Sequence, residues 1–147
     1  MTTKGVPARV GGLHLERAGD ELLVYNPADH TAHAVNHIAS VVLDACDGRR
    51  STAELVDVVG GRVDTMVDHE VIALAVSDLL DAGLITMDGP VRGVSRRSLI
   101  ARVGVGAAAI AAIPVVESIT APSPAAAMSP GPETDDQPVD ELTTEGT

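Results

Sequence analysis

Residues 13–35 read LHLERAGDELLVYNPADHTAHAV, and this stretch decides the fold. Apolar and polar side chains alternate at residues 13–15, as in a strand with one buried face. A Gly-Asp turn separates this strand from a second β-rich run at 22–25. Asn26-Pro27 ends that run, because proline cannot donate to a strand ladder, and 31–35 supplies a third strand. The stretch therefore predicts a three-stranded antiparallel meander.

The apolar period becomes helical after this meander. Asn36 is placed to cap a first helix, whose apolar residues recur at spacings of three and four. Residues 51–54 read STAE, a capping box that opens a second helix through about Val59. Asp64 is the expected cap of a third helix, which runs to about Ala82 and is followed by a short extended piece. The predicted fold class is α+β, with a winged-helix-like order β-β-β-α-α-α.

Composition limits the kinds of partner and chemistry. The formal net charge of −11 opposes binding to nucleic acid, whose phosphates would be repelled. The chain has no Phe or Trp, and Tyr25 is its one Tyr, so the core must be aliphatic and little aromatic surface is left for stacking. The single Cys46 lies in an apolar helical pattern, which predicts a buried small hydrophobe rather than a nucleophile.

Charge and composition divide the chain into four parts. Residues 1–12 carry Gly and Pro without periodicity and are expected to be a loose lead-in. Residues 13–90 are the expected domain, and 91–127 combine basic residues with an apolar run. Residues 128–147 are acidic and rich in Pro and Gly, so this tail is expected to be disordered.

Four motifs follow one another along the predicted domain: Asn26 after the second strand, the Val35-Asn36 step into a helix, DGRRS at 47–51 leading to Glu54-Leu55, and DLLDAGLI at 78–85. Their order is that of the PqqD family of small leader-peptide-binding modules, the recognition elements for ribosomally made, modified peptides. Between about Leu13 and Ile85 the chain resembles this family. The resemblance implies a non-catalytic module that binds the leader of a precursor peptide and presents it to a modifying enzyme.

The physics of sheet edges supports the binding mode that the resemblance implies. An edge strand presents unpaired N–H and C=O groups, and an extended peptide can add there as a further strand. The third helix would form the opposite wall of the groove. The alternative for its apolar positions is that they belong only to the core. The predicted peptide-binding residues are Thr31, Ala32, His33, Ala34 and Val35 on the strand, and Val71, Leu74, Ala75 and Asp78 on the helix.

No pattern in the sequence points to catalysis, a metal or another cofactor. His30, His33 and His37 are close in sequence, but the segment crosses from strand to helix, so their spacing does not place them on one face. We expect them to be solvated turn histidines. The chain contains no nucleophile elbow, phosphate-binding loop or dinucleotide fingerprint. The sequence therefore predicts a protein that is not an enzyme and has no cofactor.

The segment after the domain resembles a twin-arginine export signal. Its motif residues are Ser95, Arg96, Arg97 and Leu99. An apolar run at 103–116 follows, and Ala125-Ala126-Ala127 resembles a cleavage site. The run spans about 21 Å as a helix against a hydrocarbon core of ~30 Å, which is typical of a signal rather than a stable span. We expect contact with a membrane or export machinery through 95–127, with the domain cytoplasmic at the inner face of the membrane. The alternative is an Ala-rich helix lying against the domain or a partner.

Three functions are consistent with the sequence. The first is the PqqD-like module, with a precursor peptide and a modifying enzyme as partners and without nucleic acid. The second is a winged-helix DNA-binding regulator, which the acidic third helix disfavours because a recognition helix normally brings Lys or Arg to the groove. The third is a membrane-tethered scaffold that acts through its C-terminal segment.

Overall fold

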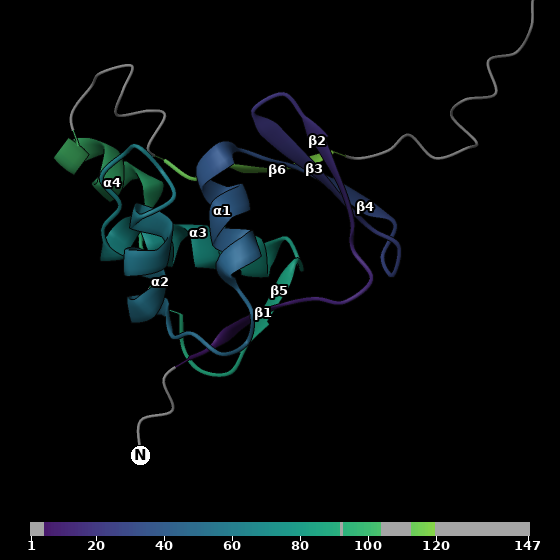
Figure 1. The fold of residues 1–147 in the computed structure, drawn as a ribbon, viewed down its shortest axis with the longest axis horizontal. Coiled ribbons are helices and arrows are strands. Elements are labelled where there is room, and N and C mark those ends of the chain that lie inside the picture. Colours follow the sequence, from purple (N-terminus) through teal and green to yellow (C-terminus); the bar gives the residue numbers. More distant parts are fainter. Residues whose placement is uncertain (1–4, 92, 104–112, 120–147) are drawn as a thin grey trace, which may run out of the picture.

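The computed structural model describes residues 5–91, 93–103 and 113–119, which fold as a mixed α+β structure with antiparallel sheets and four helices (Figure 1). The strands are β1 (Pro7–Arg9), β2 (His14–Ala18), β3 (Glu21–Asn26), β4 (Thr31–Val35), β5 (Ile85–Met87) and β6 (Val116–Ile119). The helices are α1 (His37–Ala45), α2 (Thr52–Gly60), α3 (His69–Asp81) and α4 (Arg96–Val103). The expected acidic tail at 128–147 lies outside the described residues.

The larger sheet has four strands in the order β2-β3-β4-β6, and all neighbours are antiparallel. The predicted third strand at 31–35 has the bounds of β4. The sequence predicted three strands with this one at the edge. That was wrong about the edge, because β6 pairs with β4 and makes it an inner strand. The added strand comes from the segment that was expected to follow the domain as a signal or helix.

The two faces of this sheet differ in burial. Leu22, Val24 and Val35 point to the helices and are at most 6% exposed. β2 lies at the outer edge of the sheet, and all its residues are exposed (Figure 1). The prediction that the first strand buries one face was therefore wrong, and Leu15 is 41% exposed. Alternation of apolar and polar residues fits a strand, but it does not establish that another layer covers it.

The helices begin where capping chemistry supplies an acceptor. The Asn36 side chain accepts from the Ala39 amide at 3.1 Å, which confirms it as the cap of α1. The Glu54 carboxylate reaches back to the Ser51 amide at 2.7 Å, as the capping box predicts. The third helix is capped by Asp68 instead of Asp64, because the Asp68 side chain accepts from two amides of the first turn.

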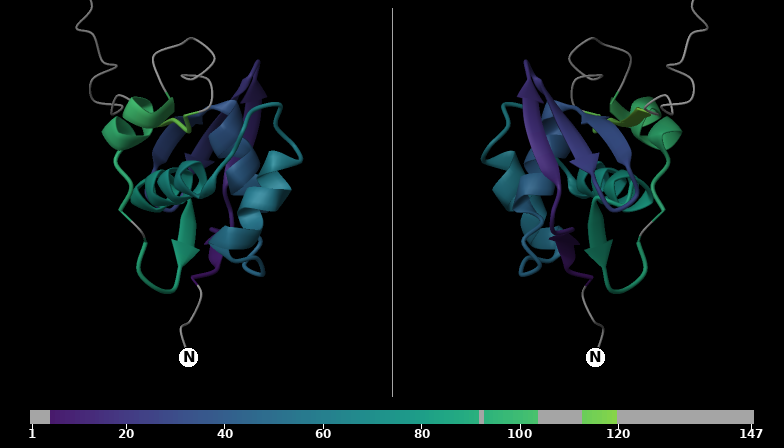
Figure 2. Two further views of the ribbon diagram at one scale, coloured as in Figure 1. Left: turned by 90° about the vertical axis from the view of Figure 1, so that its left-hand side faces the viewer. Right: turned by 90° about the vertical axis from the view of Figure 1, so that its right-hand side faces the viewer.

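A second, two-stranded sheet joins the ends of the domain. β1 pairs with β5 in antiparallel register, with Ala8 opposite Thr86. Figure 2 shows this pair below the helices, away from the four-stranded sheet. The expected loose lead-in at 1–12 is thus corrected for residues 7–9. The pairing joins segments almost at opposite ends of the domain, so no local pattern reveals it.

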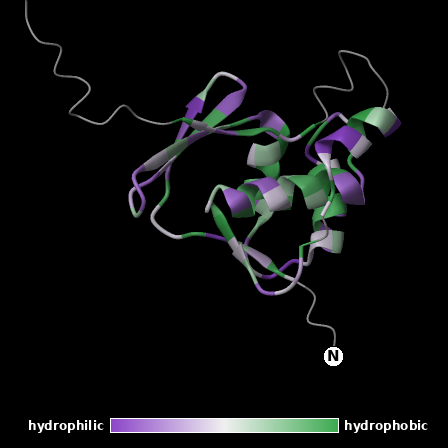
Figure 3. Cartoon of the chain, turned by 180° about the vertical axis from the view of Figure 1, so that it is seen from behind, coloured by the Kyte–Doolittle hydropathy of each residue, from purple (hydrophilic) through white to green (hydrophobic). Residues whose placement is uncertain are grey.

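Apolar residues gather where the helices meet one another and the sheet (Figure 3). The main cluster is a set of buried residues that all lie between Leu22 and Ile85. Cys46 belongs to it and is 2% exposed, which confirms it as a buried small hydrophobe. Burial raises the pKa of its thiol to about 12, so the nucleophilic thiolate is suppressed.

The segment expected to follow the domain is partly packed onto it. α4 packs on α3, and α2 lies on another side of α3 (Figure 2). The predicted apolar run at 103–116 is described only at its ends, and residues 104–112 lie outside the described part. Its last residues, from Ile113, are extended rather than helical and lead into β6. Among the described residues, none of the helices combines the length and apolar character that crossing a membrane requires.

Candidate functional site: a strand-edge groove filled by the chain's own C-terminal segment

The groove predicted at β4 is occupied by residues 113–119, which we call the docked segment. Its strand β6 runs antiparallel to β4, with Ala32 opposite Ile119 and Val35 opposite Val116. The ladder extends beyond the strands, because the Asn36 amide donates to the Val115 carbonyl at 3.0 Å. An extended peptide segment therefore lies where strand addition was expected.

The hydrogen-bond register assigns each amide of β4 to one neighbour. In an antiparallel ladder, alternate residues exchange hydrogen bonds with the same neighbouring strand. Since the Asn36 amide faces the docked segment, those of Ala34 and Ala32 face it too. The amides of His33 and Val35 face β3. The amides of Ala32 and Ala34 therefore report on pairing with the docked segment, and those of His33 and Val35 report on pairing with β3.

A second hydrophobic cluster joins the docked segment and α4 to the helices of the domain. Ile38 on α1 and Val71 and Leu74 on α3 supply the domain side, and each is at most 3% exposed. Leu99 of α4 and Ile113 of the docked segment supply the other side, at 1% and 7% exposure. This cluster shares no buried member with the main cluster. We define the groove as the β4 edge together with the side chains of Ile38, Val71 and Leu74.

Asn36 connects the docked segment to the first helix. Its side-chain oxygen caps α1, and its side-chain NH₂ donates to the Ile113 carbonyl at 2.8 Å. Together with its backbone amide, which bonds Val115, the residue holds the start of the docked segment by two hydrogen bonds. A single side chain thus serves both the helix start and the bound strand.

Arg96 of α4 connects this helix to α3 and to the docked segment. Its guanidinium forms an ion pair with Asp78 of α3 and donates to the Pro114 carbonyl at 3.0 Å. The Asp78 side chain is 19% exposed. Burial raises the pKa of this carboxyl, and Arg96 only partly offsets the effect. A second, more exposed ion pair joins Arg102 of α4 to Glu70 of α3.

His33 joins β4 to the docked segment through its side chain. The residue is 3% exposed, with Nε2 at 3.1 Å from the Thr31 hydroxyl and Nδ1 at 3.1 Å from the Ser118 hydroxyl. Burial lowers its pKa, against a smaller opposite effect of Asp29, so the neutral ring is favoured. The expectation of a solvated turn histidine was therefore wrong for His33, which lies on the inward face of a strand.

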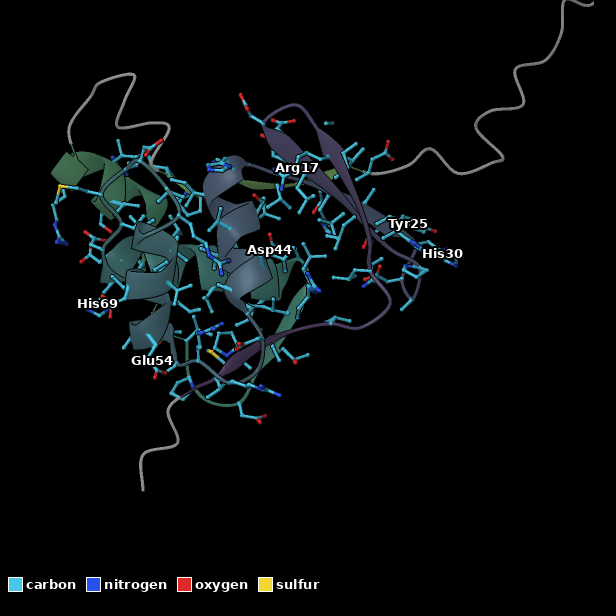
Figure 4. The ribbon with its side chains drawn as sticks, in the orientation of Figure 1. Arg17, Tyr25, His30, Asp44, Glu54 and His69 are labelled. Atoms are coloured by element: carbon cyan, nitrogen blue, oxygen red, sulfur yellow. The ribbon has the colours of Figure 1, made fainter. Side chains whose placement is uncertain are left out.

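The other two histidines of that group, His30 and His37, are exposed. His30 occupies the left-handed region, with φ of 57°, and its Nδ1 lies 3.1 Å from the Tyr25 hydroxyl. Figure 4 shows Tyr25 and His30 together at one end of the sheet, with His69 on the opposite side of the molecule. His37 is the first residue of α1. The described residues contain no group of three or more His, Cys, Asp or Glu arranged to hold a metal ion.

The nine predicted groove residues fall into distinct places. Ala32, His33, Ala34 and Val35 pair with β6, and Thr31 lies one position beyond the ladder. Val71 and Leu74 belong to the second cluster together with Ile113 of the docked segment, and Asp78 forms an ion pair with Arg96. Ala75 is 0% exposed and belongs to the main cluster, so it lies behind the groove. Because Ala75 has a similar spacing on the helix to Val71 and Leu74, the sequence pattern could not tell a core residue from a groove residue.

The four twin-arginine-like residues are not equivalent. Ser95 precedes α4, and its hydroxyl accepts from the Ser98 amide at 3.1 Å. Arg96 and Leu99 face the domain and are held there, while Arg97 is exposed. The two neighbouring arginines therefore offer a matched pair, one bound and one free of the groove.

Three residues of the site were missed as site residues by sequence reasoning. Asn36 was recognised only as a helix cap, and Ile38 only as part of an apolar stripe. Glu70 was placed on the polar side of its helix. A sequence signal existed for Glu70 and Asp78, since two acids on one helix are followed by basic residues at 96–102. Nothing local connects Asn36 to Ile113.

Comparisons of the chain with protein-family models, curated protein sequences and solved structures found no match.

Proposed function

We propose that this protein is a non-catalytic peptide-binding module of the PqqD-like kind. In this proposal, the β4 edge and the α1–α3 side chains bind the leader of a ribosomally made precursor peptide by strand addition. The module then presents the precursor to a separate modifying enzyme. We also propose that the arrangement of its strands and helices is winged-helix-like.

The observation that carries the proposal is the pairing of β4 with β6. An extended segment lies antiparallel on this edge, with Val35 opposite Val116. Ile113 shares a buried apolar cluster with Val71 and Leu74, so backbone pairing and an apolar contact act together. Main-chain hydrogen bonds supply affinity for peptides of many different sequences, and the apolar contact fixes the register of the bound peptide.

The alternatives have less support from the same contacts. A DNA-binding α3 would need an exposed basic face, but the helix contains no Lys or Arg. Two of its three acids, Glu70 and Asp78, form ion pairs with Arg102 and Arg96. A membrane-tethered scaffold would depend mainly on 104–112 and 120–147, which lie outside the described residues.

The test uses the full chain, labelled with ¹⁵N, and a synthetic leader of a precursor encoded beside its gene. We expect amide shifts concentrated on β4 and on the groove side of α3, near Val71 and Leu74. A scrambled leader of the same composition is the control and should produce none. Shifts confined to α2, or an equal response to both peptides, would contradict the proposal.

A further inference from the structure

The groove contains a complete set of contacts to the chain's own residues. The docked segment pairs its backbone with β4, and Ile113 lies in the second cluster at 7% exposure. Arg96 and Asn36 hold its first carbonyls at 3.0 and 2.8 Å. A peptide arriving from solution would need the same edge of β4, and a strand has only one such edge left beside β3.

We propose that residues 113–119 are an intramolecular competitor for the peptide that the groove binds. A captured peptide takes their place on β4. This removes the Pro114 carbonyl that Arg96 contacts and the Ile113 side chain that shares a cluster with Leu99, while the ion pairs Arg96–Asp78 and Arg102–Glu70 still join α4 to α3. The inference rests on the proposed function and adds its regulation: capture of a peptide and release of the docked segment are one equilibrium.

The docked segment also defines the class of peptide that fits. Ile113 enters the second cluster, and three residues later Val116 packs against the main cluster. Two residues further on, the Ser118 hydroxyl meets the His33 ring at 3.1 Å. The matching ligand is therefore an extended segment that runs antiparallel to β4, with apolar residues three apart and a hydroxyl residue two positions after the second.

Mass action gives the competition its expected size. A tethered segment acts at an effective concentration on the order of millimolar, so a free peptide of equal intrinsic affinity binds only when the tethered one is displaced. The apparent dissociation constant rises by the reciprocal of the fraction of chains whose groove is open. Because the coupling is reciprocal, a bound peptide lowers the apparent affinity of the docked segment for β4 by the same mass action.

Position 117 allows the docked segment to be weakened without touching the groove. Glu117 is exposed and lies opposite Ala34, in the set of residues whose amides face β4. Replacing it with proline removes that donor from the ladder. Glu117→Ala keeps the amide and serves as the matched control. Ile113→Asp is a second route, because it places a charge in the apolar second cluster.

The experiment measures fluorescence anisotropy of a labelled, N-acetylated peptide with the sequence IPVVESI, titrated with full-length chains. We expect Glu117→Pro and Ile113→Asp to bind this probe at least tenfold more tightly than the unaltered chain, and Glu117→Ala to bind like the unaltered chain. A scrambled probe should bind to none of them.

The outcomes separate the competition from the proposed function. If all chains bind the probe with equal affinity, the groove accepts a peptide and the competition is overturned. If neither weakened chain binds the probe at all, the competition is overturned and strand addition in trans fails with it. Tighter binding by both weakened chains, but not by Glu117→Ala, supports the inference.

Discussion

The two apolar clusters of this protein differ in which parts of the chain build them. The main cluster draws all its buried members from residues 22–85, and from the docked segment only the partly buried Val116 packs against it. The second cluster has five buried members, and two of them, Leu99 and Ile113, come from beyond residue 90. The first is a core in the ordinary sense. The second is an interface between the domain and a segment that lies on it, so we expect the domain to keep its core when the docked part is weakened.

The largest effect is expected from a cavity in the main cluster. Leu43 of α1 is 0% exposed, and Leu43→Ala should lower the free energy of unfolding by about 2–5 kcal/mol. Chemical denaturation monitored by circular dichroism measures this change. A loss as small as that of an exposed substitution would mean that the main cluster does not carry the stability of the domain.

A smaller and local effect is expected in the second cluster. Leu99→Ala removes a side chain that is 1% exposed, and the chain can respond by detaching α4 while it keeps the main cluster. We expect the free energy of global unfolding to fall by about 1 kcal/mol, with faster amide exchange along α4. Ile100→Ala is the control, because Ile100 is 44% exposed. Equal losses for Leu99→Ala and Leu43→Ala would contradict the distinction between the clusters.

The neighbouring arginines test the polar side of the same interface. Arg96→Ala removes the ion pair to Asp78 and the hydrogen bond to the Pro114 carbonyl. Since the Arg96 side chain is 40% exposed, we expect a cost of about 1 kcal/mol or less in docking. Exchange at the Ala34 amide, which faces the docked segment, should become faster for Arg96→Ala and stay unchanged for Arg97→Ala. Identical behaviour of the two variants would remove Arg96 from the account.

The smallest effect is expected from pH, through His33. Burial lowers the pKa of His33 in the folded chain, whereas in the unfolded chain the residue takes up a proton at about pH 6.5. The unfolded chain then binds more protons below that value, so the contribution of the neutral ring is present above about pH 6.5 and lost as the pH falls through the lower folded-state pKa. Exchange at the Ala34 amide should therefore show weaker docking at acidic pH, after correction for intrinsic exchange rates.

Two variants separate His33 from other titrating groups. His33→Gln should flatten the dependence on pH between neutrality and mild acid. His37→Gln changes an exposed histidine at the start of α1 and should leave the profile as it is. A profile that His33→Gln does not alter would assign the effect to other groups, such as carboxylates that titrate at lower pH.

Local signals in the sequence were enough for the elements of the domain. Asn36 and the Ser51–Glu54 pair act over three residues, and the chemistry of each cap is complete within one turn. Strand β4 was found from five residues because a proline and a change of period delimit it. Such signals identify elements without showing what covers them, which is why Leu15 was wrongly expected to be buried.

Long-range pairings could not be predicted in the same way. β1 has three residues and too little periodicity to stand out. β5 was predicted as a short extended piece after the third helix, but nothing in its sequence shows that β1 is its partner. β6 lies in a segment whose basic and apolar order resembled an export signal, and that pattern says nothing about an antiparallel partner at β4. The groove residues were predicted because an edge strand exposes its backbone to any partner. The identity of the occupant depends on a contact 77 residues apart, between Asn36 and Ile113.

Amide hydrogen exchange along β4 tests the central claim most directly. The amides of Ala32 and Ala34 face the docked segment, and those of His33 and Val35 face β3. In Glu117→Pro, the account predicts at least tenfold faster exchange at Ala32 and Ala34, unchanged exchange at His33 and Val35, and recovery of protection when the IPVVESI peptide is added. If all four amides change together, or if the peptide restores none of the lost protection, this edge is not a site where one extended strand replaces another.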